Sequence, residues 1–468
     1  MIGKPHVRTH LLSAGVGLVL AALYAASPLT VLVLIAAPVI ATVSTRGLPA
    51  QERRWLIGIL STAFALRLLF VALQFIIALP LLNDTGIGGL TGDESYYLSR
   101  ALRSRDLMLG FTAGKYDYFV ANDDYGRTSY LGLLTWIQLV FGPTPYSMKV
   151  LNALLFTASA LLLFRMAHTA FGFRPAFMGL AILLFLPSLF VSSVSLVKES
   201  LYGLVASALT VGSLSAVRAA VARRWLNAAL ALMAVAASLW LMNDLRRGAL
   251  LIGVAGLGIG AGIRLGARPR WRAASAGAAL LVVGVIVVSQ PPWRARALDG
   301  VTAAATMHAG HVFTVGHAYK LLDDGFYKNP GAAMAWDITL TEPQAMRFLV
   351  RAAVSFLVTP LPWEMRSVSE LAFMPEHMVW FLLLALLPVG LAAGWKRDPL
   401  VTSLLMGFAL PAAAVVALTT GNVGTLLRLR GLVTPYIVWP AALALCVLGE
   451  RLATRHAASR PAMDGPET

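Results

Sequence analysis

The sequence predicts an all-α membrane protein that crosses the bilayer about twelve times. Of its 468 residues, 58% are hydrophobic and only 13% are charged, whereas soluble domains are about 45–50% apolar and about 25% charged. Apolar runs recur along the chain, many of them near the ~20 residues that a helix needs to cross the hydrocarbon. Backbone N–H and C=O groups must be paired inside lipid, so we expect these runs to be helices.

The N-terminal part, residues 1–54, is predicted to form a two-span hairpin followed by a loop. Its apolar stretch at 11–43 is expected to break near Ser27 and Pro28. A secretory signal peptide is the competing interpretation. The stretch is too long for one and lacks a clear cleavage site, so the hairpin is favoured.

The next part, residues 55–290, is predicted to be a transmembrane module whose first span is 55–80. The first extracytoplasmic loop, 81–147, follows that span. The outward-facing loops are expected to carry short helices, and the apolar portion of this loop at 130–141 is expected to lie in the membrane interface. A second extramembrane region, 291–377, is expected before the C-terminal spans within 378–450, and 451–468 form a polar tail. The later expected spans are 148–168, 174–193, 199–217, 225–242, 247–263, 273–290, 378–394, 399–419 and 430–449.

Basic residues mark alternate loops. Those within 46–54, 165–174, 218–224, 264–272 and 396–397 are assigned to the cytoplasm by the positive-inside rule, which also places both termini there. The distribution of these residues explains the net charge of +16 by membrane topology, so no nucleic-acid partner is expected. The single cysteine, Cys446, excludes a disulfide within the chain.

Polar clusters gather on the predicted outward side. They are Asp93 with Glu94, Lys198 with Glu199, Arg246 with Arg247, and Arg428 with Arg430. Arginine near lipid is costly, so it usually has a partner or a function, and its planar guanidinium suits phosphate or carboxylate. The clusters predict a site that binds an anionic lipid head group and deprotonates a neighbouring group. A solvated loop, an ion pair or a helix anchor explains each cluster taken alone, and the sequence leaves these alternatives open.

Three other features favour structural roles. Arg67 lies inside 55–80, the third expected span of the chain, and is expected to be a charged side chain packed for a structural role. The four alternating glycines at 256–262 favour close helix packing. The three histidines within 308–317 support a metal site only weakly, because no cysteine or clear helical register accompanies them.

Residues 93–97, Asp-Glu-Ser-Tyr-Tyr, open the first outward loop, and 139–142 (Leu-Val-Phe-Gly), 149–152 (Lys-Val-Leu-Asn), Phe171-Gly172, Pro187-Ser188 and Glu199 follow in order. This pattern resembles the GT-C membrane glycosyltransferases, in particular the bacterial family related to protein mannosyltransferases and aminoarabinose transferases. The resemblance extends over roughly residues 55–220. Beyond it, 421–425 with Arg428 and Arg430 is similar to a late motif of bacterial members.

The resemblance implies a helical fold in a bacterial inner membrane, with the active site facing the periplasm or exterior. It implies a polyprenyl-phosphate-linked sugar as donor, Asp93 as the base and Glu94 as its companion. Substrate-binding roles are expected for Tyr97, Lys198, Glu199, Arg246, Arg247, Arg428 and Arg430, with the arginines on the lipid phosphate. Two extra N-terminal spans and the lack of a large C-terminal soluble domain are departures from the family, so acceptor recognition stays open.

The sequence-based hypothesis is therefore transfer of a sugar from a polyprenyl-phosphate donor to an extracytoplasmic glycan, lipid or protein. The arginines would stabilise charge on the leaving phosphate, and a divalent cation could replace part of that charge; no other cofactor is expected. One alternative is a polymerase or ligase for O-antigen or exopolysaccharide. Another is a transporter of lipid-linked sugars, which would place polar or broken helices near the membrane midplane.

Overall fold

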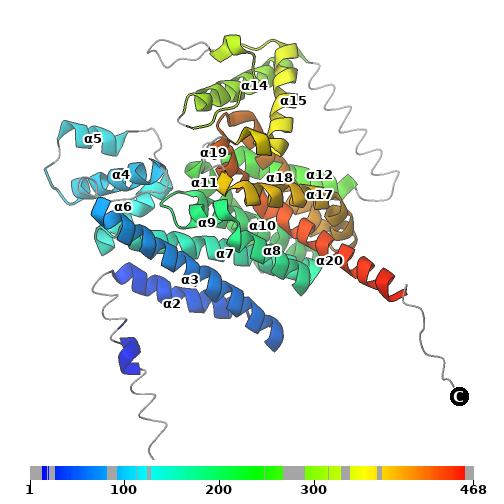
Figure 1. The fold of residues 1–468 in the computed structure, drawn as a ribbon, viewed down its shortest axis with the longest axis horizontal. Coiled ribbons are helices and arrows are strands. Elements are labelled where there is room, and N and C mark those ends of the chain that lie inside the picture. Colours follow the sequence, from blue (N-terminus) through cyan, green and yellow to red (C-terminus); the bar gives the residue numbers. More distant parts are fainter. Residues whose placement is uncertain are drawn as a thin grey trace, which may run out of the picture. The chain divides into compact units, whose positions relative to one another are not determined.

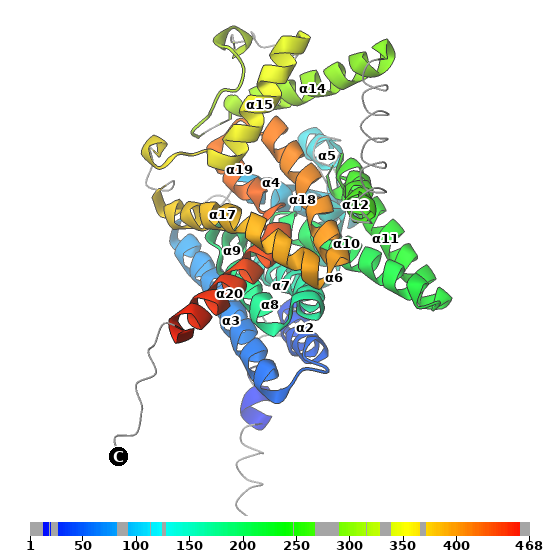
Figure 2. The ribbon, with the colours of Figure 1, turned by 90° about the vertical axis from the view of Figure 1, so that its right-hand side faces the viewer.

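The computed structural model describes residues 13–17, 19, 27–81, 92–112, 114–123, 128–246, 248–266, 290–314, 316–327, 338–365 and 371–458. Within these residues the protein is all-helical (Figures 1 and 2). The β-structure found there is one isolated bridge between Ala318 and Asn422. The all-α prediction is therefore confirmed for this part of the chain.

Two compact units divide the chain. Unit 1 contains Met1–Leu162, Phe190–Ala208 and Trp240–Ala249, and unit 2 contains Leu163–Leu189, Leu209–Leu239 and Leu250–Thr468. Helices that contribute to both units are α7 (Pro145–Phe171), α9 (Pro187–Ser193), α10 (Glu199–Val221), α11 (Trp225–Leu245) and α12 (Ala249–Gly266). The two units are described separately below.

Unit 1 places three short helices of the predicted first loop beside one another. Its own helices are α2 (Pro28–Ser44), α3 (Ala50–Leu81), α4 (Gly92–Met108), α5 (Lys115–Asn122) and α6 (Ser129–Phe141). Helix α4 packs against both α5 and α6 (Figure 1). Short helices in this loop were expected, and α6 coincides with the apolar portion predicted at 130–141.

Unit 2 is built around α18, which contacts α14, α15, α17, α19 and α20. Helix α17 also packs along α20, and α20 along α8 (Figure 2). The helices of this unit are α8 (Phe173–Phe185), α14 (Pro291–Val312), η1 (Asp324–Tyr327), α15 (Glu342–Val358), η2 (Pro362–Glu364), α17 (Met374–Arg397), α18 (Pro399–Thr419), α19 (Val423–Arg430) and α20 (Thr434–Ala458).

Seven described helices are long and apolar enough to cross a membrane, and an eighth span results if α8 and α9, bent by 63° at their junction, are taken together. Helices α2 and α12 match two further expected spans, but their apolar parts are shorter than those of the seven helices. Residues 273–289 of the expected span at 273–290, and most of the first expected span, 11–26, lie outside the described residues. The structure thus supports a membrane-embedded protein, and the predicted count of about twelve is not confirmed.

Glycines bring α12 and α18 into close contact. A Cβ added to Gly407 would lie 2.4 Å from the carbonyl oxygen of Gly256, and one added to Gly260 would lie 3.2 Å from that of Ser403. Gly258 and Gly262 face open space. The packing role expected for 256–262 is therefore confirmed at Gly256 and Gly260.

Arg67 is a packed charge, as expected. Its side chain is buried in α3, where Nε donates to Ser193 Oγ at 2.8 Å and Nη1 to the carbonyl of Ala63 at 3.1 Å. The guanidinium lies between the rings of Phe156 and Phe190, 4.9 and 4.8 Å from their centroids. Hydrogen bonds and aromatic faces together compensate the loss of hydration inside a span.

Candidate functional site

The two carboxylates at the start of α4 occupy different environments. Asp93 is exposed, whereas the side chain of Glu94 is fully buried. Both belong to the first turn of the helix, where unpaired backbone N–H groups favour negative charge. The structure therefore provides one accessible acid and one enclosed acid at adjacent positions.

Glu94 joins α4 to two other segments of unit 1. One carboxylate oxygen lies 3.3 Å from Nζ of Lys149 in α7, and the other accepts a 2.7 Å hydrogen bond from the backbone N–H of Leu196. Lys149 also donates to Oε1 of Gln74 in α3 at 2.7 Å. Because these contacts leave Glu94 no solvent exposure, its side chain holds the first turn of α4, including Asp93, in a fixed position.

Leu196 lies in a non-helical segment, 194–198, between α9 and α10. Residues 194–197 are almost completely buried, so their polar backbone groups need partners inside the protein. Nδ2 of Asn152 lies 2.6 Å from the carbonyl oxygen of Ser195 and 3.0 Å from that of Val197. Asn152 and Glu94 together stabilise this irregular segment, which ends where α10 begins.

The first residue of α10, Glu199, pairs with an arginine at the end of α11. Glu199 Oε1 lies 3.7 Å from Nη2 of Arg246, and the guanidinium stands over the ring of Tyr202. Both charged side chains are partly buried. Among the described residues, the guanidinium of Arg246 makes no hydrogen bond within 3.5 Å. Its N–H groups are thus suited to bind an anion that comes close to Glu199.

Tyr130 of α6 lies near both acidic positions. Asn152 Nδ2 is 3.0 Å from its hydroxyl oxygen, and its ring packs edge-on against that of Tyr97. Burial raises the pKa of Tyr130, the bond from Asn152 opposes this, and the carboxylates of Glu199 and Glu94 add to the increase. Both carboxylates therefore favour the neutral form of the same buried hydroxyl group.

Unit 1 thus brings together several residues that the sequence singled out. Asp93, Glu94, Lys198, Glu199 and Arg246 all belong to this unit, where Glu94 bonds the backbone of Leu196, Glu199 pairs with Arg246, and Lys198 is half-buried. Tyr97 is buried and packs against other aromatic rings, so its described contacts are structural. Arg247 lies outside the described residues.

The remaining predicted arginines belong to unit 2, so their meeting with Asp93 stays a prediction. Arg428 is half-buried, and Arg430 is buried. Nε and Nη2 of Arg430 donate to the carbonyl oxygen of Phe356, and Nη2 also donates to that of Thr359. Its guanidinium stands 4.8 Å from the ring centroid of Trp380. Burial lowers the pKa of Arg430 to about 9, which leaves it cationic at neutral pH.

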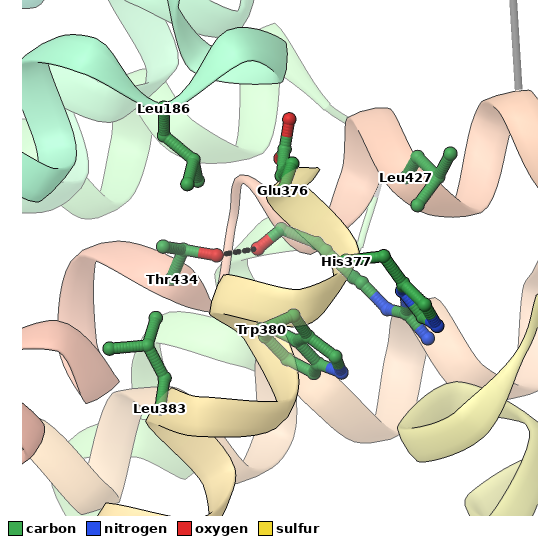
Figure 3. A pocket seen from close by; sticks show the side chains of 8 residues that line it. Leu186, Glu376, His377, Trp380, Leu383, Leu427 and Thr434 are labelled. Carbon is green, nitrogen blue, oxygen red and sulfur yellow. Dashed lines mark hydrogen bonds between the residues drawn. The ribbon is translucent and has the colours of Figure 1, made fainter. Parts of the chain in front are cut away.

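A small cavity adjoins Arg430 (Figure 3). Its volume of about 10 Å³ is about that of a single water site. It is lined by Leu186, Glu376, His377, Trp380, Leu383, Leu427, Arg430 and Thr434. A phosphate group is too large for this space, so the predicted phosphate contact at Arg430 requires its carbonyl bonds to open.

Glu376 fixes the break between α8 and α9. Its carboxylate accepts a hydrogen bond from the N–H of Ser188 at 2.7 Å and another from the Ser188 hydroxyl. The break leaves N–H groups in the first turn of α9 without helical partners, and Glu376 satisfies that of Ser188. Glu376, like Lys149 and Asn152, was not predicted as a site residue. A charged or amide side chain within or beside an apolar run was the signal that could have identified all three.

Two of the three histidines within 308–317 bond backbone carbonyl groups. Nδ1 of His308 lies 2.6 Å from the carbonyl oxygen of Thr420, and Nδ1 of His311 lies 2.7 Å from that of Thr419. In the part of the chain that the structure describes, no three His, Cys, Asp or Glu side chains are arranged to hold a metal ion. We therefore assign no chemical step to a divalent cation.

Comparisons with protein-family models, with curated proteins and with solved structures gave no match to this chain. The interpretation of the site therefore rests on its residues and on the resemblance noted in the sequence.

Proposed function

We propose that the protein is an integral-membrane glycosyltransferase that uses a polyprenyl-phosphate sugar and carries its catalytic groups in unit 1. One observation carries the proposal: the exposed carboxylate of Asp93 directly precedes Glu94, whose buried carboxylate is bound to Lys149 and to the N–H of Leu196. A base must be positioned accurately with respect to the group that it deprotonates. The bonds of Glu94 supply this positioning for the helix turn that carries Asp93.

In the proposed reaction, an acceptor hydroxyl or amine attacks the anomeric carbon of the sugar. Asp93 accepts the proton of the attacking group as the new glycosidic bond forms. The bond between the anomeric carbon and the phosphate oxygen breaks, and polyprenyl phosphate leaves with the electron pair. One displacement of this kind inverts the anomeric configuration, in contrast to the two-carboxylate retaining mechanism.

Positive charge near the leaving phosphate would come from Arg246 and Lys198 in the same unit. Arg246 is held by a long ion pair with Glu199 and retains N–H groups for an anion, and a preorganised donor of this kind stabilises developing charge. The donor is a lipid, so this function also accounts for a site in a membrane-embedded protein. We propose a bacterial inner membrane as the location, with the site on the extracytoplasmic face.

The test uses the full-length protein in liposomes with a panel of radiolabelled polyprenyl-phosphate monosaccharides and a membrane extract as the source of acceptors. We expect release of polyprenyl phosphate together with transfer of the label. Asp93→Asn should reduce turnover by about 10²–10⁴-fold, the usual contribution of a general base. The matched control is Asp117→Asn, which alters an acid in the first turn of α5 that pairs with Arg103. Wild-type turnover by Asp93→Asn would remove Asp93 from the mechanism.

The break between α8 and α9 favours one second candidate, a transporter of lipid-linked sugars, because transporters use interrupted helices at their binding sites. The same liposomes separate the two functions. A transporter would move the labelled lipid across the bilayer without release of free polyprenyl phosphate, and that result would refute the glycosyltransferase.

A further inference from the structure

The C-terminal end of α15 is capped by buried side chains. The last carbonyl groups of a helix have no partners within the helix, and at a solvated end they usually bind water. Here Arg430 donates to the carbonyl oxygens of Phe356 and Thr359, and Nε1 of Trp380 donates to that of Leu357 at 3.0 Å. Such capping is what a helix end needs where water is excluded.

This capped end lies beside the interior of a span. Trp380 is six residues beyond Met374, the first residue of α17, which corresponds to about 9 Å along the helix. The ring of Phe356 packs edge-on against that of Trp380, with 5.5 Å between their centroids. The last turn of α15 is therefore level with the apolar part of α17, below the start of that span.

The middle of α15 lies at the end of another span. The ring of Phe348 is 5.8 Å from that of His308, which in turn bonds the carbonyl of Thr420, the residue that follows α18. Eight residues, or about 12 Å of helix, separate Phe348 from Phe356. Helix α15 therefore runs from the edge of α18 towards the interior of α17, and Figure 2 shows it descending beside α18.

A second apolar stripe of α15 has no described protein neighbour covering it. Met346, Val350, Val354 and Leu357 are 62, 57, 53 and 43% exposed, and their spacing places them on one side of the helix. A different side carries the buried residues Ala345, Phe348, Ala352 and Phe356. The stripe thus extends along the part of α15 that lies at the depth of the neighbouring spans.

The charged residues of α15 lie in its N-terminal two-thirds. Arg347 and Arg351 both pair with Asp323, at 3.3 and 3.2 Å, and all three side chains are exposed. No charged residue follows Arg351 in the helix. Long basic side chains can keep their charge at the head-group level while the helix below them is apolar.

We infer that α15 is a re-entrant helix that enters the bilayer from the side on which α18 ends, and that its stripe of Met346, Val350, Val354 and Leu357 contacts lipid acyl chains. Arg430 acts as the polar cap of its inner end. The occupant of the stripe is lipid because both neighbouring helices at this depth, α17 and α18, are long and apolar enough to be spans and because Arg430 and Trp380 cap the adjacent carbonyl groups. This inference does not depend on the proposed enzymatic function.

The test measures the depth of spin labels in liposomes. Single cysteines at Met346, Val350, Val354 and Leu357 are introduced into a Cys446→Ala background and labelled with a nitroxide. Collision rates with oxygen and with a water-soluble nickel chelate are then compared. Labels at Leu382, an exposed position within α17, and at Asp324, an exposed position in η1, give the lipid and water references.

The expected result is a ratio of oxygen to nickel collisions that rises steadily from Met346 to Leu357 and approaches the value at Leu382. Nickel access at Val354 and Leu357 as high as at Asp324 would place the stripe in water and overturn the inference. Equal ratios at all four positions would indicate a helix lying flat in the interface, which also overturns it. Low collision rates with both reagents, with dipolar broadening between labels, would identify a second copy as the occupant and refute lipid contact.

Discussion

The ion pair between Glu94 and Lys149 allows the positioning argument to be tested by stability measurements. At 3.3 Å and an effective dielectric constant of ~20, the Coulomb attraction is about 5 kcal/mol. Burial has already cost both groups their hydration, so the net value of the pair is smaller, but removal of one partner leaves an uncompensated buried charge. Lys149→Met is therefore expected to destabilise the protein by about 3–5 kcal/mol.

Glu94→Gln should cost less than Lys149→Met. The amide oxygen can still accept the hydrogen bond from Leu196, and Lys149 keeps Gln74 as a partner. The double variant leaves no unpaired charge, so it should be more stable than Lys149→Met alone. The coupling energy in this double-mutant cycle is expected to be at least about 2 kcal/mol.

The assay is reversible unfolding in mixed detergent micelles, followed by tryptophan fluorescence and circular dichroism. The matched control is Lys320→Met, which removes an exposed partner of Asp324 at 3.0 Å and should cost less than about 1 kcal/mol. Additive effects of the two unit 1 substitutions would show that Glu94 and Lys149 do not depend on each other. The explanation for the fixed position of Asp93 would then fail.

Two further predictions concern unit 2. Burial lowers the pKa of His308 from 6.5 to about 4, so the unfolded chain binds more protons than the folded protein between these two pH values. The contribution of His308 to the free energy of unfolding is therefore fully present above pH ~6.5, and it should decline by about 3 kcal/mol as the pH falls towards 4. In thermal unfolding measured from pH 7.5 to 4.5, His308→Asn should lose less stability on acidification than the wild type. An unchanged pH profile would show that His308 is not the group responsible. Gly407→Ala should destabilise by about 1–3 kcal/mol, because its Cβ would meet the backbone of Gly256. Gly258→Ala, which faces open space, should be neutral or slightly stabilising in the same assay, and equal losses in both variants would exclude the proposed contact.

The sequence predicted the helical class and most spans because hydropathy reports a property of each segment alone. The run at 399–419 is a helix with the expected bounds, and the run at 148–168 lies within the longer helix Pro145–Phe171. The run at 174–193 behaved differently: it breaks at Pro187, and Glu376, nearly two hundred residues away, satisfies the broken end. A proline within an apolar run indicates a possible break, but the group that stabilises it cannot be read from local sequence.

The candidate site was predictable only where its residues stand out in the local sequence. Acids and arginines at span ends were conspicuous, and the pairing of Glu199 with Arg246 is observed at 3.7 Å. Lys149 and Asn152 belong to the segment 149–152 that supports the resemblance, but neither was given a role of its own, because a polar residue at the start of an apolar helix does not indicate its partner. The partners of Arg430 are carbonyl groups of Phe356 and Thr359, and backbone acceptors have no sequence signature.

The placement of Arg67 has a consequence for how the protein responds to its host membrane. A shift of α3 along its axis by one turn, about 5.4 Å, would withdraw the guanidinium from the rings of Phe156 and Phe190 and expose it to hydrocarbon, at a cost of roughly 3 kcal/mol. Thinner or thicker bilayers should therefore be accommodated by local deformation of the lipid or by tilt of whole groups of helices. Sliding of α3 on its own is the least favourable adjustment.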